Sequence, residues 1–248
     1  TLAQIQPLLE QRFGSWRAPT EAKPTKNIAS VALAAKPRVY LINRTGAEQS
    51  QIVAASVGPT RADPDHIRFV VMDTLMGGNF SSRLNMNLRE DKHWSYGAGS
   101  RLTDSVGPGT WRAAAGVQTD KTAESMVEIR KELTEVLASN KPTEKEVQFA
   151  KDSLVIALPG QNETSDEIAG AYAEILTFGL KESYWNDFVG EVNAVTVDDV
   201  NRTSGKLIRP DSLTWFVVGD LSKIEAKVRA LNFGEVTVID ADGKPLAR

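Results

Sequence analysis

The sequence predicts an α+β fold of two layers, a mainly antiparallel sheet with helices packed on one face. Strand-like and helix-like runs come in blocks rather than in strict alternation, which favours an antiparallel or mixed sheet. A glycine-proline-glycine turn at 107–109 separates two strand candidates, as in an antiparallel pair. Two Thr-x-x-Glu capping boxes open apolar-periodic runs and identify helices. With 248 residues, the chain is long enough to bury a substantial core.

The first predicted element is a helix over residues 2–13, where apolar residues recur at helical spacing and Gly14 follows as a stop. A stretch of mixed charge that contains two prolines comes next and has the composition of a linker. A helix this apolar needs a covering surface. We therefore expect residues 1–30 to be the last helix of a preceding domain plus a linker, and residues 31–248 to form the C-terminal domain.

Two strand candidates, 38–42 and 51–57, are separated by a turn-rich connection and are expected to form a hairpin. A helix should follow, with Asp63 as its N-cap and Pro64 at its first position. The glycine pair at 77–78 is expected to end this helix.

The strand candidates around the glycine-proline-glycine turn span residues 96–103 and 110–118. Three glycines interrupt them, namely Gly97, Gly99 and Gly116. They indicate either bulges and bends or an edge strand that could accept an extended peptide, and the sequence favours neither.

The second half of the chain is predicted to be largely helical, beginning with residues 119–139. The capping boxes at Thr143 and Thr164 open two further helices, the first ending at Pro159 and Gly160 and the second near Gly179. Thr196 is expected to cap a short helix. The tail supplies a strand at 213–218, a helix at 221–231 and a final strand at 236–239.

Composition excludes several classes of function. A net charge of −3 and a pI near 5.6 argue against a general nucleic-acid binder. The absence of cysteine excludes disulfides and thiolate chemistry but leaves both the bacterial periplasm and the cytoplasm open. No apolar run is long enough for a membrane span. The start has neither signal-peptide features nor an initiator methionine, so we expect a fragment or a processed product.

The candidate functional residues are Arg89 and Tyr96, which lie seven positions apart where a short amphipathic segment meets a strand. A guanidinium offers a rigid fork of donors and a phenol adds one donor on a stiff ring, a pairing suited to a carbonyl or an oxyanion. The alternative is that both side chains are merely solvated or packed.

The whole string from Met76 to Thr103 resembles the C-terminal domain of pitrilysin-type zinc metallopeptidases, the family of insulinase and the mitochondrial processing peptidase. The matching residues are Gly77, Gly78, Ser82, Arg83, Leu84, Leu88, Arg89, Glu90, Ser95 and Tyr96. The resemblance extends from the first helix to the last strand, and it implies that Arg89 and Tyr96 hold the substrate backbone opposite the zinc. His93 and Trp94 depart from it, because the family commonly has Gly-Leu there.

The chain has no H-x-x-E-H motif, with which this family binds zinc and activates water. Its two histidines, His66 and His93, are expected to be solvent-exposed rather than metal ligands. No P-loop, dinucleotide fingerprint or nucleophile elbow is present. We therefore expect no cofactor in this chain and zinc in a partner domain or subunit. Tryptophans at 94, 111, 185 and 215 are expected to be core or interface anchors.

The preferred hypothesis is the substrate-binding part of a two-part zinc peptidase, whose partners are an H-x-x-E-H domain or subunit and a peptide. The chain alone is not expected to be active, and a homodimer and a heterodimer both remain open. One alternative is a non-enzymatic scaffold or assembly subunit of the same fold, as in the core proteins of respiratory complexes. Another is a free-standing peptide-binding domain.

Overall fold

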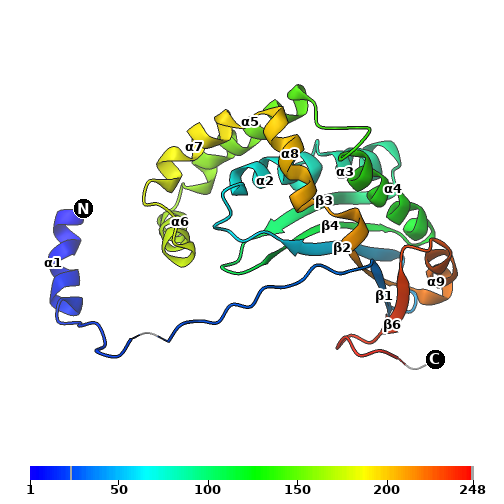
Figure 1. Cartoon of the computed structure of the whole chain (residues 1–248), viewed down its shortest axis with the longest axis horizontal. Coiled ribbons are helices and arrows are strands. Elements are labelled where there is room, and N and C mark those ends of the chain that lie inside the picture. Colours follow the sequence, from blue (N-terminus) through cyan, green and yellow to red (C-terminus); the bar gives the residue numbers. More distant parts are fainter. Residues whose placement is uncertain (23, 247–248) are drawn as a thin grey trace.

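The computed structural model describes residues 1–22 and 24–246, which form one six-stranded sheet with helices on one side (Figure 1). The strand order is β3-β4-β2-β5-β1-β6. The strands are β1 (Arg38–Asn43), β2 (Gln49–Gly58), β3 (Ser95–Thr103), β4 (Gly109–Gln118), β5 (Thr214–Gly219) and β6 (Glu235–Ile239). The predicted two-layer α+β architecture is confirmed, and β3 lies at one edge of the sheet.

The sheet is mixed, and the predicted hairpin between the first two strands is wrong. β1 pairs in parallel with β5 and β6, whereas β2 pairs antiparallel with β4 and β5. The connection over 44–48 therefore crosses the end of β5, where the amide of Arg44 donates to the carbonyl of Gly219 at 2.7 Å. Two strand spacings are about 10 Å, which five residues span easily. A short turn-rich connection thus did not require that its two strands be neighbours.

The helical segments pack mainly above the strands in Figure 1. Those of the first half are α1 (Leu2–Phe13), α2 (His66–Asp73), the π-helical turn η1 (Thr74–Gly78), α3 (Arg83–Asn85), the π-helical segment η2 (Met86–Asp91) and the 3₁₀ turn η3 (Thr119–Lys121). Those of the second half are α4 (Thr122–Glu135), α5 (Glu144–Gln161), α6 (Ser165–Phe178), α7 (Tyr184–Ala194), α8 (Val197–Leu207), the 3₁₀ turn η4 (Pro210–Ser212) and α9 (Leu221–Ala230).

The hydrophobic core lies between the sheet and this helical layer. Alternate strand residues are buried, as the pleat requires, and Trp111 and Trp215 are the largest side chains sealed from solvent. Helix residues such as Phe69 and Leu133 meet them from the other layer. Trp94 and Trp185 pack on the core while partly exposed, so the tryptophans are anchors as predicted.

Three predicted caps are present. The hydroxyls of Thr143 and Thr164 accept hydrogen bonds from the amides three residues on, and the glutamates there reach back. Thr196 does the same with Asp199 as its partner. Gly179 ends α6 in the left-handed region, where glycine carries no steric cost.

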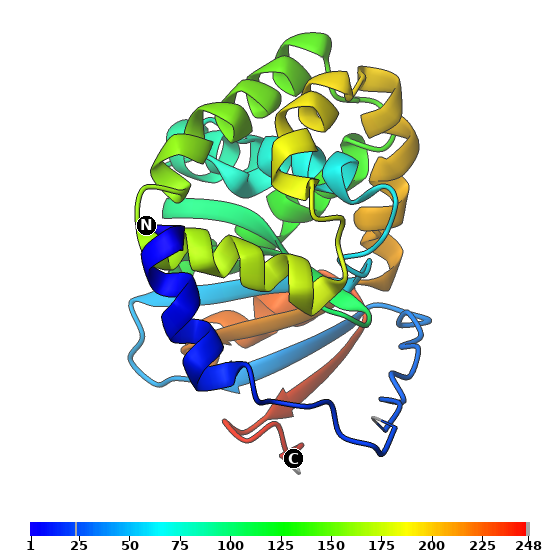
Figure 2. The same ribbon diagram turned by 90° about the vertical axis from the view of Figure 1, so that its left-hand side faces the viewer.

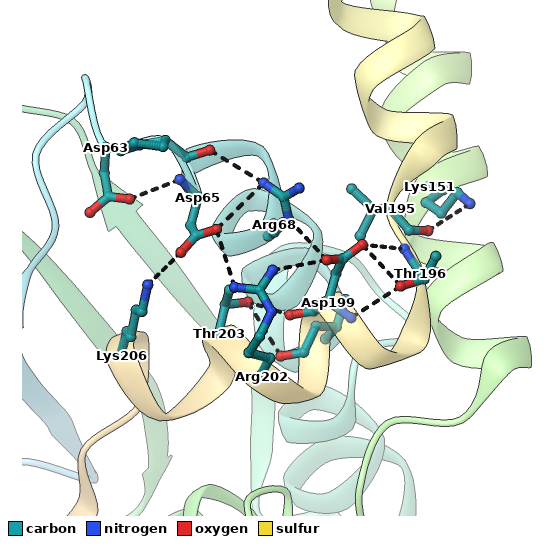
Figure 3. Close-up of polar contacts among 12 residues, drawn as sticks. Asp63, Asp65, Arg68, Lys151, Val195, Thr196, Asp199, Arg202, Thr203 and Lys206 are labelled. Atoms are coloured by element: carbon teal, nitrogen blue, oxygen red, sulfur yellow. Dashed lines mark hydrogen bonds and ion pairs between the residues drawn. The ribbon is translucent and has the colours of Figure 1, made fainter.

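The start of α2 lies two residues later than predicted. Asp63 is not the N-cap, because its carboxylate accepts the amide of Asp65 at 2.8 Å and closes a turn before the helix. Asp65 occupies the N-cap position instead, and its own carboxylate is engaged by Lys206 and Arg202 of α8 (Figure 3). The Asp65 carboxylate is thus used in ion pairs with α8, which are tertiary contacts that the local sequence around Asp63 does not show.

Two helical segments differ from the prediction further along. α5 continues to Gln161 with Pro159 inside its last turn, where a proline removes one hydrogen bond and the helix ends soon after. α7 was not predicted, and its aromatic residues Tyr184, Trp185 and Phe188 form a contacting cluster. Lys151 of α5 donates to the carbonyls of Asn193 and Val195 at the end of this helix, and Figure 3 shows its bond to Val195.

The N-terminal helix α1 lies at one end of the molecule, away from the sheet (Figures 1 and 2). The predicted helical span is confirmed, yet none of its residues is buried. Leu2, Leu8 and Phe13 are among its exposed apolar side chains. Among the described helices, none has both the length and the apolar character to cross a membrane.

Candidate functional site

The candidate site is built where η2 passes into β3. Leu84 and Leu88 are sealed in the core and fix this segment to the sheet, so that Arg89, the next residue, is carried to the surface. The Arg89 guanidinium lies over the ring of Phe80, 4.7 Å from its centre, and its Nε is 3.3 Å from a carboxylate oxygen of Glu90. The Arg89 side chain remains 41% exposed. It is held in place but is open to a ligand.

Tyr96 reaches solvent because β3 contains a bulge. Ser95 pairs with Val117 and Ala98 pairs with Ala115, so three residues on β3 cover a step of two on β4. The Ser95 hydroxyl holds the bulge, with its oxygen 2.7 Å from the carbonyls of Gly97 and Gly116 and accepting the Gly97 amide at 3.0 Å. Tyr96 itself is 86% exposed.

The two predicted site residues are therefore both accessible at one element junction, and neither is packed into the core. Phe80, which sequence reasoning did not single out, supports Arg89 and is itself 57% exposed. No signal in the sequence pointed to it, since a single exposed apolar residue is common on protein surfaces.

The residue at the centre of this junction, His93, has a left-handed backbone with φ of 57°. It follows the end of η2, where the Lys92 amide bonds the Asn87 carbonyl and the Trp94 amide bonds the Leu88 carbonyl, both at 3.0 Å. This is the position where helices favour glycine. The resemblance also expects glycine here, so the histidine keeps the loop geometry but carries a backbone strain.

The outer edge of β3 is closed beyond the bulge. Asp73 accepts the Leu102 amide at 3.2 Å and the Ser100 hydroxyl at 2.6 Å, and the Trp111 indole donates to it at 2.8 Å. Burial raises the pKa of Asp73, although these donors act against the rise. Asn85 accepts the Ala98 amide. An added peptide strand would therefore find these amides occupied, and the glycine-rich strand is a bulge with a covered edge.

His66 is buried, which contradicts the expected exposure. Arg61 can only donate, so its contact of 3.2 Å makes His66 Nδ1 an acceptor and leaves Nε2 to donate to Asp104 at 2.7 Å. Arg61 also pairs with Glu174 of α6 at 2.7 Å. Both ring nitrogens of His66 are thus engaged in a structural cluster.

His93 is exposed as predicted, and its Nδ1 lies 3.0 Å from the Arg89 carbonyl. Within residues 1–22 and 24–246, no group of three or more acidic or histidine side chains could hold a metal ion. The two histidines of this chain do not fit the zinc site that such peptidases require.

Several similarities to known proteins bear on this site. Residues 1–154 match the family model described as the peptidase M16 inactive domain. The chain is 27% identical over 204 residues to an uncharacterized zinc protease of Mycobacterium tuberculosis, covering 81% of this chain and 45% of that protein. It is 23% identical over 209 residues to the uncharacterized zinc protease YmxG of Bacillus subtilis, covering 82% and 48%.

Two solved structures are also similar to this chain. A peptidase M16 inactive domain from Pseudomonas fluorescens superposes with a TM-score of 0.69 at 25% identity, covering 77% of this chain and 46% of that one. A protease from Helicobacter pylori gives a TM-score of 0.77 at 19% identity, covering 88% and 52%, and shares the fold.

The fold and these similarities define the class, a metallopeptidase-related α+β half-domain of the pitrilysin type. Within it, the chain belongs to the peptidase M16 inactive domain family. The chain spans about half the length of the relatives it matches.

Proposed function

We propose that this chain is the substrate-binding half of a two-part zinc peptidase, with zinc supplied by an H-x-x-E-H domain or subunit. Arg89 and Tyr96 donate hydrogen bonds to the peptide carbonyl next to the scissile bond and to the negative charge that develops on its oxygen. The single observation that carries this proposal is that both donors are accessible at one junction, which the buried side chains of Leu84 and Leu88 fix to the sheet.

The geometry supports a binding role in a specific way. Arg89 is oriented by Phe80 beneath it, and Tyr96 is directed outward by the bulge at Ser95. Donors held in advance where charge develops stabilise a transition state more than donors that must reorganise.

The partner half is proposed from the surface of the molecule. The helix α1 exposes a row of apolar side chains that a preceding domain would cover, in line with residues 1–30 being the end of such a domain. The chain also covers less than half of the M. tuberculosis relative. A covalently attached half and a separate subunit both meet this requirement.

A scaffold subunit that does not cut is the second candidate. Exposed apolar residues on α5 and α6, Ile156 and Leu176, would serve an assembly interface in either case. A chain of complex III2 from Candida albicans shares the fold with a TM-score of 0.63 at 16% identity. In a pure scaffold, Arg89 and Tyr96 would be replaceable without consequence.

The test is peptide hydrolysis by this chain assembled with the H-x-x-E-H polypeptide of the same organism. Arg89→Ala and Tyr96→Phe should each lower kcat/KM by about a hundredfold. Matched controls are Arg44→Ala in the β1–β2 connection and Tyr172→Phe on α6, both exposed and both expected to leave turnover unchanged. Full activity of both site variants would remove the proposed role and favour the scaffold.

A further inference from the structure

Asn85, at the end of α3, connects the two halves of the candidate site through one buried amide. Its side-chain Nδ2 donates to the Phe80 carbonyl at 2.7 Å, and its Oδ1 accepts the Ala98 amide at 3.2 Å. The residue is only 3% exposed. Both partners are backbone groups, so the orientation of the amide is determined by the structure around it.

Each of these bonds ends beside one of the proposed substrate donors. Phe80 carries the ring on which the Arg89 guanidinium rests. Ala98 is the first residue of β3 after the bulge that directs Tyr96 outward. The Phe80 loop and the β3 bulge belong to separate elements, and Asn85 bonds to both.

The chemistry of this position suits asparagine in particular. It needs one donor and one acceptor on a short planar group, which aspartate cannot provide because an ionised carboxylate only accepts. Aspartate would also place a negative charge against the Phe80 carbonyl in a buried site, which is unfavourable. Alanine would remove both bonds and leave the Phe80 carbonyl and the Ala98 amide without the partner that they share.

We propose that Asn85 is a positioning residue, which sets the placement of Arg89 relative to Tyr96 without touching the substrate. This inference rests on the proposed function of those two residues. If Asn85 acts in this way, loss of its amide lowers turnover by misplacing Arg89 relative to Tyr96. The effect of an Asn85 substitution should then disappear in a variant that already lacks one of these two donors.

The kinetic test is a double-mutant cycle in the assembled peptidase. Asn85→Asp should lower kcat by about tenfold or more with a smaller change in KM, because the misplaced donors act mainly on the transition state. In the Tyr96→Phe background, Asn85→Asp should lower kcat by less than about twofold. Fully multiplicative effects would overturn the inference. Asn85→Ala, which leaves room for water, should show the same coupling if the aspartate variant fails to fold.

Asn87 supplies a matched control. It is also a buried asparagine, but its amide donates to Glu128 and Glu132 of α4 rather than to either half of the site. Asn87→Ala should lower stability while its kinetic effect remains multiplicative with that of Tyr96→Phe. Equal coupling for Asn85 and Asn87 would mean that Asn85 acts only through general stability, and would overturn the inference.

A structural measurement separates this inference from the proposed function. The chain has four tyrosines, so fluorotyrosine labelling yields four ¹⁹F resonances. Asn85→Asp should shift the resonance of Tyr96 and leave that of Tyr172 on α6 in place. If Arg89 and Tyr96 variants keep full activity, the proposed function fails whatever this spectrum shows. If they lose activity and the Tyr96 resonance does not move, the positioning role of Asn85 fails alone.

Discussion

The guanidinium carbon of Arg89 lies 4.7 Å from the centre of the Phe80 ring, and both side chains remain open to solvent. A cation over a ring at an exposed site gains about 0.5–1 kcal/mol. The contact also restricts a long, flexible side chain to one region of space. Arg89 therefore meets a ligand with part of its ordering already complete.

Phe80→Ala should lower kcat/KM of the assembled peptidase about two- to fivefold, the equivalent of the lost cation–π contact. The reason is that Arg89 would sample more rotamers before it binds the substrate. The informative comparison is with the Arg89→Ala background, in which Phe80→Ala should have no further effect. A similar loss in both backgrounds would show that Phe80 acts without Arg89.

His93→Gly should raise the free energy of unfolding by about 1 kcal/mol, because the left-handed backbone at φ 57° costs a residue with a Cβ atom about 1–2 kcal/mol. Loss of the contact with the Arg89 carbonyl offsets part of the gain. Urea denaturation measures the difference. Asn232→Gly is the control, since Asn232 has φ of 52° but asparagine tolerates this region better, so its gain should be smaller. A lower free energy of unfolding in His93→Gly would show that the left-handed backbone at His93 is not strained.

Arg61→Met should destabilise the fold by about 1.5–3 kcal/mol, because it removes the charged hydrogen bonds of a buried guanidinium to two partly exposed carboxylates. Arg61 is 3% exposed and bonds Glu174 of α6 and Asp104. Hydrogen exchange should show a larger loss of protection in α6 than in the other helices, because α6 has one buried residue of its own. Arg61→Lys should recover only part of the stability, since an ammonium cannot form the same planar fork. Unchanged exchange in α6 would refute the anchoring role.

Asp199 should make the stability of the fold depend on pH in the acidic range. Hydrogen bonds from Arg202 and then from the Thr196 backbone and side chain hold the pKa of Asp199 far below its ordinary value of 3.8 (Figure 3). The unfolded chain thus binds this proton first as the pH falls. The stabilisation is fully present above pH 3.8 and is lost as the pH drops toward the folded-state pKa.

Asp199→Asn should accordingly lower the Tm at pH 7, and the difference from the unsubstituted chain should shrink below about pH 4. Thermal unfolding followed at pH 7 and pH 3 gives the comparison. A Tm difference that stays constant between the two pH values would show that the carboxylate charge contributes nothing.

Much of the fold was predictable from local signals. The capping boxes at Thr143 and Thr164 determine their helix starts through bonds within four residues, and the turn at 107–109 connects strands that do pair. The strand neighbours of β1 were not predictable in this way. Its partner β5 lies more than 170 residues away along the chain, and pairing at that distance leaves no mark on a local pattern.

For the candidate site, the spacing of Arg89 and Tyr96 and the resemblance identified the two residues before any coordinates. Their accessibility, the Phe80 platform and the Asn85 bridge came only from the structure. His66 shows the same limit, since a lone histidine at a helix start gives no sign of the arginine and aspartate that enclose it.

By itself, the sequence determined the two-layer α+β class, the helix starts at the Thr143, Thr164 and Thr196 caps, and the choice of Arg89 and Tyr96 as candidate residues. Only the tertiary structure decided the strand order, the closed edge of β3 and the bulge that directs Tyr96 outward. The physical reason is the distance along the chain over which each kind of contact acts. Caps and turns are satisfied by neighbours in the chain, whereas strand partners and buried polar contacts are chosen by residues that only folding brings together.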